Sequence, residues 1–294
     1  MSASTQRVAV TGASGRLGRA LMGALGEAVT AVPWRRPEYD LDESDPAPLL
    51  DRDQPGLVIH AAAWTDVDGC AREPEVAARR NATAVERLAE ACVARGVGLV
   101  LVSTNEVFDG VRNDGQAYSE DDPTAPANPY GASKLAGEEA ARRAFDGRVG
   151  LWVTRTAWLY GPPGNDFPAK IVAASDRLAS SDEGEAALPV VADETGSPTF
   201  TGDLARAIVE LTRATDGGLF HLVNAGQATR YEWAAGVLER CRPGRALRPI
   251  SQRDFVRAST PPAWGVLDTG RAAAVGVHLR AWSDALSDYL PEVC

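Results

Sequence analysis

Cysteine and histidine are scarce in this sequence of 294 residues. The four cysteines form no C-x-x-C pair, and the three histidines are far apart along the chain. Structural zinc sites usually take paired ligands a few residues apart, and disulfide-stapled folds carry many cysteines in a short chain. The sequence therefore predicts neither a disulfide framework nor a metal site.

An apolar segment of roughly 18 residues, the length that spans a membrane, is also missing, as is a block of Lys and Arg. Acidic residues outnumber basic ones by 40 to 30, which gives a net charge of -10. A protein that binds nucleic-acid phosphates needs a basic surface, so we expect neither a nucleic acid nor a membrane as partner. Segment 1–7 lacks the apolar core of a signal peptide. We expect a cytoplasmic protein that is a monomer or a homodimer.

The beginning of the chain has the pattern of a strand, a glycine turn and a helix. The β-branched run 7–11 predicts the strand and the amphipathic stretch 19–25 predicts the helix. Glycines between them permit a tight turn, close approach of a pyrophosphate and close helix packing, and the helix N-terminus offers amide donors to phosphates. The spacing is G-x-x-G-x-x-G, which differs from the usual G-x-G-x-x-G. We predict a dinucleotide site that includes Gly12, Ser14, Gly15, Arg16, Leu17 and Gly18.

Two arginines follow the second expected strand, 29–32. An acidic residue at this position ordinarily binds the ribose 2′-hydroxyl of NAD, whereas an arginine binds the 2′-phosphate of NADP. Arg35 and Arg36 therefore favour NADPH over NADH, with a solvated surface pair as the alternative interpretation. Asp40 and Leu41 are expected to form a wall beside the adenine.

Strand and helix patterns then alternate up to about residue 157. The run 57–60 is nearly all apolar, as in a parallel sheet covered on both faces, a long helix is expected over 74–95, and another strand over 149–154. This alternation predicts an α/β protein with a Rossmann-type doubly wound parallel sheet. Small residues that let a cofactor lie against the backbone follow the third strand, namely Ala61, Ala62, Ala63 and Thr65.

The regular alternation ends after residue 160, where glycines, prolines and short apolar stretches replace it. We expect residues 1–157 to form the dinucleotide-binding domain. Residues 158–294 are expected to form mainly a smaller C-terminal substrate-binding region, with about 200–225 returning to the main domain. A substrate pocket would then lie over the carboxyl edge of the sheet.

A tyrosine and a lysine stand four residues apart at the start of an expected helix. This spacing puts Tyr130 and Lys134 on one helix face, where a nearby ammonium would lower the pKa of the phenol. Tyr130 could then give a proton to a carbonyl oxygen during reduction. Thr104 ends a buried strand at the carboxyl edge of the sheet and would complete a triad. Alone, such a spacing is more often a solvated helix edge, so its weight comes from the rest of the chain.

The combination of these motifs resembles the extended short-chain dehydrogenase/reductase family, and in particular its dTDP-4-dehydrorhamnose reductase branch. The resemblance covers nearly the whole chain. It is carried by the segments 12–18, 61–65, 103–110, 130–138, 155–161, 196–199 and 266–269.

The resemblance implies that NADPH delivers hydride to C4 of a nucleotide-linked 4-keto-6-deoxyhexose, with dTDP as the expected nucleotide, in deoxysugar biosynthesis. Thr104 would bind the carbonyl, Tyr130 would protonate the alkoxide, and Lys134 would also bind the nicotinamide ribose. Val67, Trp158 and Asn165 would lie near the sugar. Core packing is the alternative role for Trp158.

One departure from the branch concerns the two residues after Thr104. The branch usually carries Asp-Tyr there, and this chain has Asn105 and Glu106. A carboxylate beside the sugar should change which hexose is held, so Glu106 is a further expected substrate contact. Two alternatives stay open: a sugar-nucleotide epimerase or dehydratase of the same family, and a non-catalytic dinucleotide-binding regulatory subunit. The sugar, its nucleotide and the stereochemistry of the product alcohol are not determined by the sequence.

Overall fold

A six-stranded parallel sheet forms the centre of the protein in this computed structural model, which describes residues 6–26, 29–43, 45–181 and 186–294. The spatial order is β10-β5-β4-β3-β1-β2. The doubly wound fold expected from the sequence is therefore confirmed. The strands are β1 (Gln6–Thr11), β2 (Val29–Trp34), β3 (Leu57–His60), β4 (Gly98–Thr104), β5 (Leu151–Thr156) and β10 (Gly218–His221).

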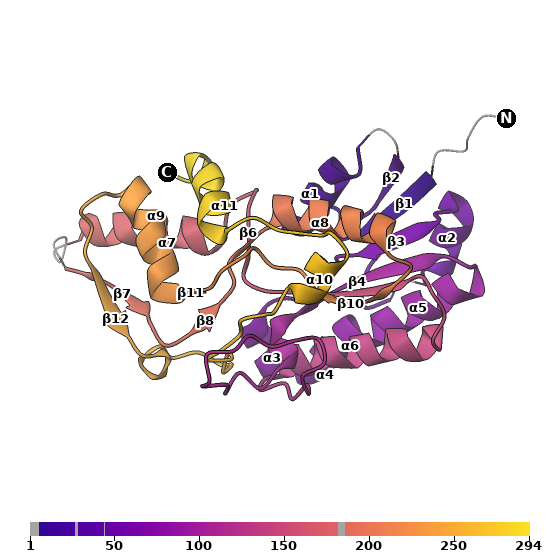
Figure 1. The fold of residues 1–294 in the computed structure, drawn as a ribbon, viewed down its shortest axis with the longest axis horizontal. Helices are drawn as coiled ribbons and strands as arrows, with labels where there is room; N and C mark the ends of the chain where they lie inside the picture. Colours follow the sequence, from indigo (N-terminus) through magenta and orange to yellow (C-terminus); the bar gives the residue numbers. More distant parts are fainter. Residues whose placement is uncertain (1–5, 27–28, 44, 182–185) are drawn as a thin grey trace.

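Helices cover both faces of this sheet (Figure 1). On one face α1 (Arg16–Ala24) packs against α8 (Thr201–Ala214), and on the other α5 (Ala84–Ala94) packs against α6 (Pro129–Phe145). β3 is buried along its whole length, because a strand between two helical layers has no solvent face. The remaining helices near the sheet are α2 (Ala47–Asp53), α3 (Val67–Arg72), α4 (Pro74–Ala78) and α10 (Gly270–Ala274).

The long helix expected over 74–95 contains a π-helical turn. It consists of α4, the turn η1 (Arg79–Thr83) and α5. The backbone oxygen of Asn81 faces Gly137 of α6, where an added Cβ would lie only 2.3 Å from it. The two helices therefore approach closely at the wide turn. The strand expected over 149–154 instead begins at Leu151, because Gly150 has a φ of +93°.

The C-terminal half builds a second hydrophobic core beside the sheet, toward the left of Figure 1. Its helices are α7 (Phe167–Ala179), α9 (Arg230–Cys241) and α11 (Trp282–Tyr289). Its short strands are β6 (Leu159–Tyr160), β7 (Leu188–Val191), β8 (Thr195–Gly196), β9 (Thr199–Phe200), β11 (Ala228–Thr229) and β12 (Leu247–Ile250). α8 and β10 from this half join the main sheet layers. The boundary at residue 157 stays a prediction.

Short 3-10 turns complete the described structure: η2 (Asn105–Val107), η3 (Gln252–Asp254) and η4 (Leu290–Glu292). Cys241 at the end of α9 forms a disulfide with Cys294, which the scattered cysteines of the sequence did not predict. The two residues are 53 positions apart, and only the packing of η4 and α9 brings them together.

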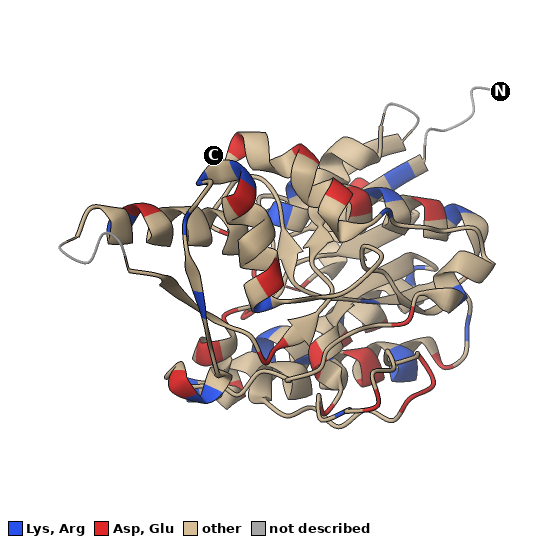
Figure 2. Ribbon diagram, turned by 60° about the vertical axis from the view of Figure 1, so that its left-hand side comes forward, with Lys and Arg blue, Asp and Glu red and all other residues tan. Residues whose placement is uncertain are grey.

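The charges are spread over the outer elements, where acidic and basic residues alternate along the helices (Figure 2). Within the described residues, no helix is long and apolar enough to cross a membrane. The expected absence of a signal peptide concerns mainly residues 1–5, which lie outside the described residues.

The strand order reverses between β1 and β3, because the chain leaves β1 toward β2 on one side and returns to β3 on the other. Ligands of open α/β sheets bind at the carboxyl ends of the strands beside such a reversal. Thr11 and His60, the last residues of β1 and β3, are register partners. The glycine turn that follows Thr11 and the alanine run that follows His60 therefore lie at that point.

Candidate active site

Two adjoining cavities lie over the carboxyl edge of the sheet, one of about 260 Å³ and one of about 440 Å³. Gly12, Gly15, Ala61 and Ala63 line both, so the two form one elongated cleft. The smaller cavity is also lined by Ser14, Arg35, Arg36, Tyr39, Asp40, Leu41, Asp42, Ala62, Trp64 and Arg80. The larger is also lined by Arg16, Leu17, Gly18, Thr65, Val67, Val102, Ser103, Thr104, Asn105, Glu106, Tyr130, Lys134, Thr156, Ala157, Trp158, Leu159 and Arg230.

The glycine turn is built for close approach of backbone. Gly12 has a φ of +64°, and a Cβ on it would lie 2.9 Å from Ala62. A Cβ on Gly18 would lie 2.1 Å from the Gly12 carbonyl oxygen. The N-cap of α1, Gly15, makes no side-chain cap hydrogen bond, which leaves first-turn amides for an acceptor such as a phosphate. This cradle fits the pyrophosphate of a dinucleotide.

Arg16 connects the glycine turn to the C-terminal half. Its Nε donates to the Gly161 carbonyl at 3.0 Å and its Nη2 to the Gly164 carbonyl at 3.1 Å. The loop before α7 is thereby held over the start of α1. Arg16 thus has a structural role besides lining the cleft.

The far end of the cleft carries the two arginines expected to select NADP. Arg35 and Arg36 line it together with Asp40 and Leu41, so all the expected cofactor residues lie along one continuous surface. Sequence reasoning missed several residues of this end, among them Trp64 and Arg80. The guanidinium of Arg80 lies 5.2 Å from the centroid of the Trp64 ring and pairs with Asp42.

Local sequence positions the tyrosine helix. The Asn128 side chain caps α6 by accepting from the Gly131 amide at 2.9 Å, and Pro129 follows at the first helical position, where its missing N–H is not needed. Gly131 is required because a Cβ there would lie 2.0 Å from the Glu106 carbonyl oxygen. The first turn of α6 therefore lies directly against the residues that follow Thr104.

Thr104, Tyr130 and Lys134 are brought together in the larger cavity. All three are buried, Tyr130 with 9% of its surface exposed. Lys134 Nζ donates to the Val102 carbonyl at 2.7 Å, and Thr104 Oγ1 accepts from the Glu106 amide at 3.2 Å. The spacing predicted that Tyr130 and Lys134 share a helix face, and the end of β4 adds Thr104.

The pKa of Tyr130 is raised, chiefly by burial and then by the nearby Glu106 carboxylate, while a hydrogen bond with Thr104 lowers it. The sequence predicted the opposite direction, because it took account of Lys134 and not of burial or Glu106. Burial lowers the pKa of Lys134 to about 8, and Glu138 partly opposes that shift. Tyr130 is thus a phenol that stays protonated at neutral pH.

A buried ion pair between Glu138 and Arg155 fixes the helix that carries Tyr130 and Lys134. Glu138, one turn after Lys134, accepts from Arg155 at 3.0 and 2.8 Å and from the Ser103 hydroxyl at 2.5 Å. Arg142 donates to the same carboxylate from the helix surface at 2.8 Å. Because Ser103 and Arg155 are register partners on β4 and β5, Glu138 fixes α6 to the ends of both strands.

The side of the cavity that we expect to bind the substrate has an aromatic wall. Trp158, with a φ of +46°, lines the cavity and also stacks on Trp233 at 5.7 Å, so it takes part in both the wall and the core. Gly196 leaves room for it, since a Cβ there would lie 2.7 Å from the indole. Val67 and Glu106 line the same cavity.

Two residues differ from expectation on this side. Asn165 is exposed in the loop before α7 with a φ of +62°, and it is not among the residues that line the cleft; its sugar contact stays a prediction. Arg230, at the start of α9, lines the cavity and was missed. No local motif marks Arg230 as a site residue, because it is far along the chain from the other residues of the cavity.

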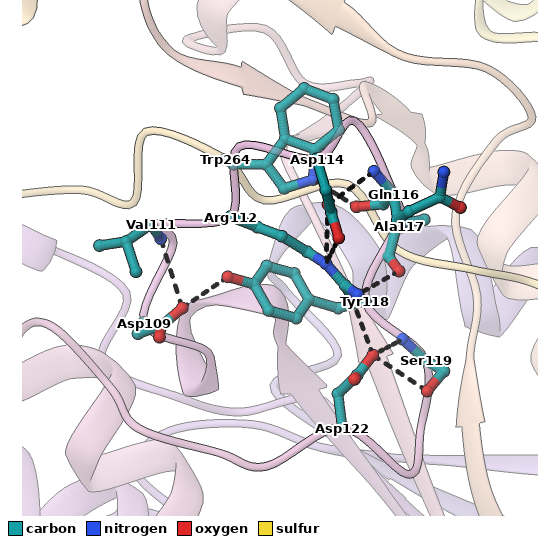
Figure 3. Close-up of polar contacts among 10 residues, drawn as sticks. All are labelled: Asp109, Val111, Arg112, Asp114, Gln116, Ala117, Tyr118, Ser119, Asp122 and Trp264. Carbon is teal, nitrogen blue, oxygen red and sulfur yellow. Dashed lines mark hydrogen bonds and ion pairs between the residues drawn. The ribbon is translucent and has the colours of Figure 1, made fainter.

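A polar network closes the loop that follows Asp109 (Figure 3). Arg112 donates to Asp114, to Asp122 and to the Ala117 carbonyl, and its guanidinium lies 5.3 Å from the centroid of the Tyr118 ring. The Trp264 indole donates to the Gln116 carbonyl at 2.8 Å. The loop is therefore fixed to the C-terminal segment, and Tyr118 in turn stacks on Phe108 at 4.3 Å.

Comparison with known proteins places this site in a family. The family model described as "RmlD substrate binding domain" matches residues 6–294. A dTDP-4-dehydrorhamnose reductase of Mycolicibacterium smegmatis is 38% identical over 98% of this chain and 86% of its own. A Streptomyces antibioticus protein named "Probable dTDP-4,6-dihydroxy-2-methyloxan-3-one 4-ketoreductase" is 38% identical over 97% of this chain and 94% of its own.

A solved structure agrees with these relatives. The dTDP-4-dehydrorhamnose reductase of Bacillus anthracis, determined in complex with NADP, superposes with a TM-score of 0.89 at 30% identity and covers 98% of this chain and 99% of its own. The family model spans nearly the whole chain, and the curated relatives match over nearly the same length. The protein therefore belongs to the RmlD substrate binding domain family.

Proposed function

We propose that this protein is an NADPH-dependent reductase that converts the C4 ketone of a dTDP-linked 4-keto-6-deoxyhexose into an alcohol. The observation that carries the proposal is the meeting of Thr104, Tyr130 and Lys134 where the dinucleotide cleft opens into the larger cavity. The relatives support it, because their names describe sugar-nucleotide ketoreductases. A nucleotide sugar is the substrate class that this reaction requires.

The chain's own residues supply binding and a proton. NADPH, when bound, supplies the hydride. Thr104 Oγ1 and the Tyr130 hydroxyl hydrogen-bond the carbonyl oxygen, and the Tyr130 proton moves to that oxygen as negative charge develops on it. The raised pKa of Tyr130 suits reduction, because the acid is protonated before the reaction begins. The Lys134 ammonium stabilises the phenolate that remains and binds the nicotinamide ribose.

The cofactor assignment rests on the far end of the cleft. Arg35 and Arg36 line the end opposite the triad, where guanidinium groups bind a 2′-phosphate in two-point fashion. The Bacillus anthracis structure contains NADP. NADPH is therefore the preferred reductant, with NADH as a weaker substitute.

The test is NADPH oxidation with dTDP-4-keto-6-deoxyglucose, offered alone and then with an epimerase of the rhamnose pathway. Turnover in either case supports the reductase, and dependence on the epimerase identifies the accepted hexose. Tyr130→Phe should keep NADPH binding and lose about 10²-fold or more in turnover, the usual scale for a lost general acid. NADPH binding without turnover on any 4-keto sugar would instead favour the regulatory alternative.

Three finer points stay predictions within this proposal. The first is that the protein is a monomer or a homodimer. The second is its cytoplasmic location. The Cys241–Cys294 disulfide argues against that location, because disulfides are uncommon in reducing compartments. The third is the contact of Asn165 with the sugar.

A further inference from the structure

Arg230 is a largely buried cation in the cavity wall that the proposed reaction does not use. Its guanidinium carbon lies 3.6 Å from the centroid of the Trp158 ring, and its Nε lies 3.4 Å from Glu194 Oε2. Among the residues that the structure describes, none accepts a hydrogen bond from either Nη atom. The side chain is 23% exposed. An arginine held against an aromatic ring with unused donors is suited to bind an acceptor in the cavity.

Glu106 supplies the complementary group in the same wall. Its Oε2 accepts from the Asn128 amide at 2.6 Å, and within the described part of the chain no donor is bonded to its Oε1. Glu106 lines the same cavity as Tyr130 and Arg230 and shifts the pKa of both, so it is near each of them. The sugar cavity therefore carries one acceptor and one donor beside the ketone position.

We propose that Glu106 and Arg230 select 4-keto-6-deoxyhexoses that keep hydroxyl groups on both C2 and C3, and reject 2,6-dideoxy sugars. One hydroxyl donates to Glu106, and its neighbour accepts from Arg230. The inference rests on the proposed function and specifies its substrate class. C3 adjoins the ketone and C2 is one carbon further. Because Glu106 is the member of the pair that shifts the pKa of Tyr130, we assign the C3 hydroxyl to Glu106 and the C2 hydroxyl to Arg230.

Family membership leaves this choice open. One relative is named for dehydrorhamnose. The name of another describes an oxane ring with hydroxyls only at positions 4 and 6. Position 5 of that ring is C2 in sugar numbering, so this second sugar has no hydroxyl on C2. A site that hydrogen-bonds a substrate hydroxyl rejects the analogue lacking it far more strongly than an apolar pocket does, because its own polar group is left unpaired. Glu106 and Arg230 should thus decide whether this chain accepts the sugar with hydroxyls on C2 and C3 or its 2-deoxy analogue.

The experiment compares kcat/KM with NADPH for dTDP-4-keto-6-deoxyglucose and for its 2-deoxy analogue. We expect the wild-type protein to prefer the hydroxylated sugar by about 10²-fold or more. Arg230→Met keeps an unbranched side chain against Trp158 and removes the donors. It should lower kcat/KM for the hydroxylated sugar about 10²-fold and for the 2-deoxy sugar only a few-fold, so the preference collapses. A purely structural role would lower both values equally.

Arg257→Met is the matched control. Arg257 also lies close enough to affect Glu106, but it pairs with Asp68 at 3.3 Å and is not among the cavity-lining residues. Its replacement should leave the preference unchanged. Arg230→Leu should reduce the preference as Arg230→Met does, which keeps the test decisive if one variant folds poorly. Glu106→Gln should lower kcat/KM for both sugars to a similar extent, because both keep the C3 hydroxyl that Glu106 binds.

The failures are distinguishable. Equal wild-type turnover of the two sugars, or an intact preference in Arg230→Met, would overturn the selection by this pair and leave the reductase assignment standing. Failure to turn over either sugar, with or without the epimerase, while NADPH binds would overturn the reductase assignment, and the present inference with it.

Discussion

At the scale of single residues, burial decides the protonation states of the site. Tyr130 is removed from water and lies near a second acidic group, so its pKa rises, whereas the same burial lowers the pKa of Lys134. Desolvation always disfavours the charged form, which moves acids and bases in opposite directions. The protein thus holds a protonated phenol beside an ammonium that titrates within reach of ordinary buffers.

The pH profile of kcat/KM follows from these two directions. We expect kcat/KM for reduction to be level below pH 8 and to fall as the pH rises through about 8, because Lys134, whose pKa is lowered to about 8, then loses its charge. Tyr130 does not contribute to this fall, since its pKa is raised. Initial rates at low substrate concentration, measured from about pH 6 to about pH 10, the reference pKa of a tyrosine, test this profile. The inflection should be absent from the residual activity of Lys134→Met; its persistence there would assign it to another group.

At the scale of secondary structure, one carboxylate fixes α6, the helix that carries Tyr130 and Lys134, to the sheet. Glu138 joins α6 to Ser103 on β4 and to Arg155 on β5. The side chain of Glu138 is fully buried and that of Arg155 is 2% exposed. Removal of one partner from a buried pair leaves the other charge without compensation. The placement of Lys134 and Thr104 therefore depends on a residue that does not line the cavity.

Glu138→Gln should accordingly destabilise the protein by about 3 kcal/mol, the scale for a broken buried pair. Arg142→Ala removes the exposed partner of the same carboxylate and should cost less than about 1 kcal/mol. Urea unfolding followed by circular dichroism measures both changes. Similar losses of unfolding free energy in the two variants would show that the buried pair with Arg155 stabilises the protein no more than the exposed pair with Arg142.

At the scale of the whole molecule, the disulfide attaches the end of the chain to the C-terminal core. It closes a loop with a sequence separation of 53, and the chain-entropy description gives a stabilisation of up to about 4 kcal/mol for a loop of that size. The same core contains Trp233, which stacks on Trp158. The wall of the larger cavity is thus continuous with the hydrophobic core to which the disulfide attaches the end of the chain.

Cys294→Ser should lower the free energy of unfolding by about 2–4 kcal/mol. Unfolding in urea without reductant compares the variant with the wild-type protein. Addition of dithiothreitol to the wild-type protein should reproduce the loss, whereas the variant should not respond. An unaltered midpoint in Cys294→Ser would mean that the disulfide does not stabilise the fold.

The cofactor half of the site could be predicted from local sequence. The glycine turn needs a positive φ and close approach of neighbouring backbone, and β3 beside it is buried along its whole length. Short contiguous segments of the sequence are enough to recognise both features. Tyr130 and Lys134 followed from helix geometry in the same way. Arg230 and the disulfide could not be found, because each depends on segments far apart in the chain that meet only in the folded protein.

The sequence by itself determined the alternation of strands and helices around the sheet, the dinucleotide turn and the shared helix face of Tyr130 and Lys134, because each depends on periodicity or spacing within a few residues. The tertiary structure alone decided the direction of the Tyr130 pKa shift and the position of Arg230 beside Trp158 and near Glu106. Burial and the approach of distant charges are properties of packing, and desolvation with Coulomb interactions acts only once those groups are brought together.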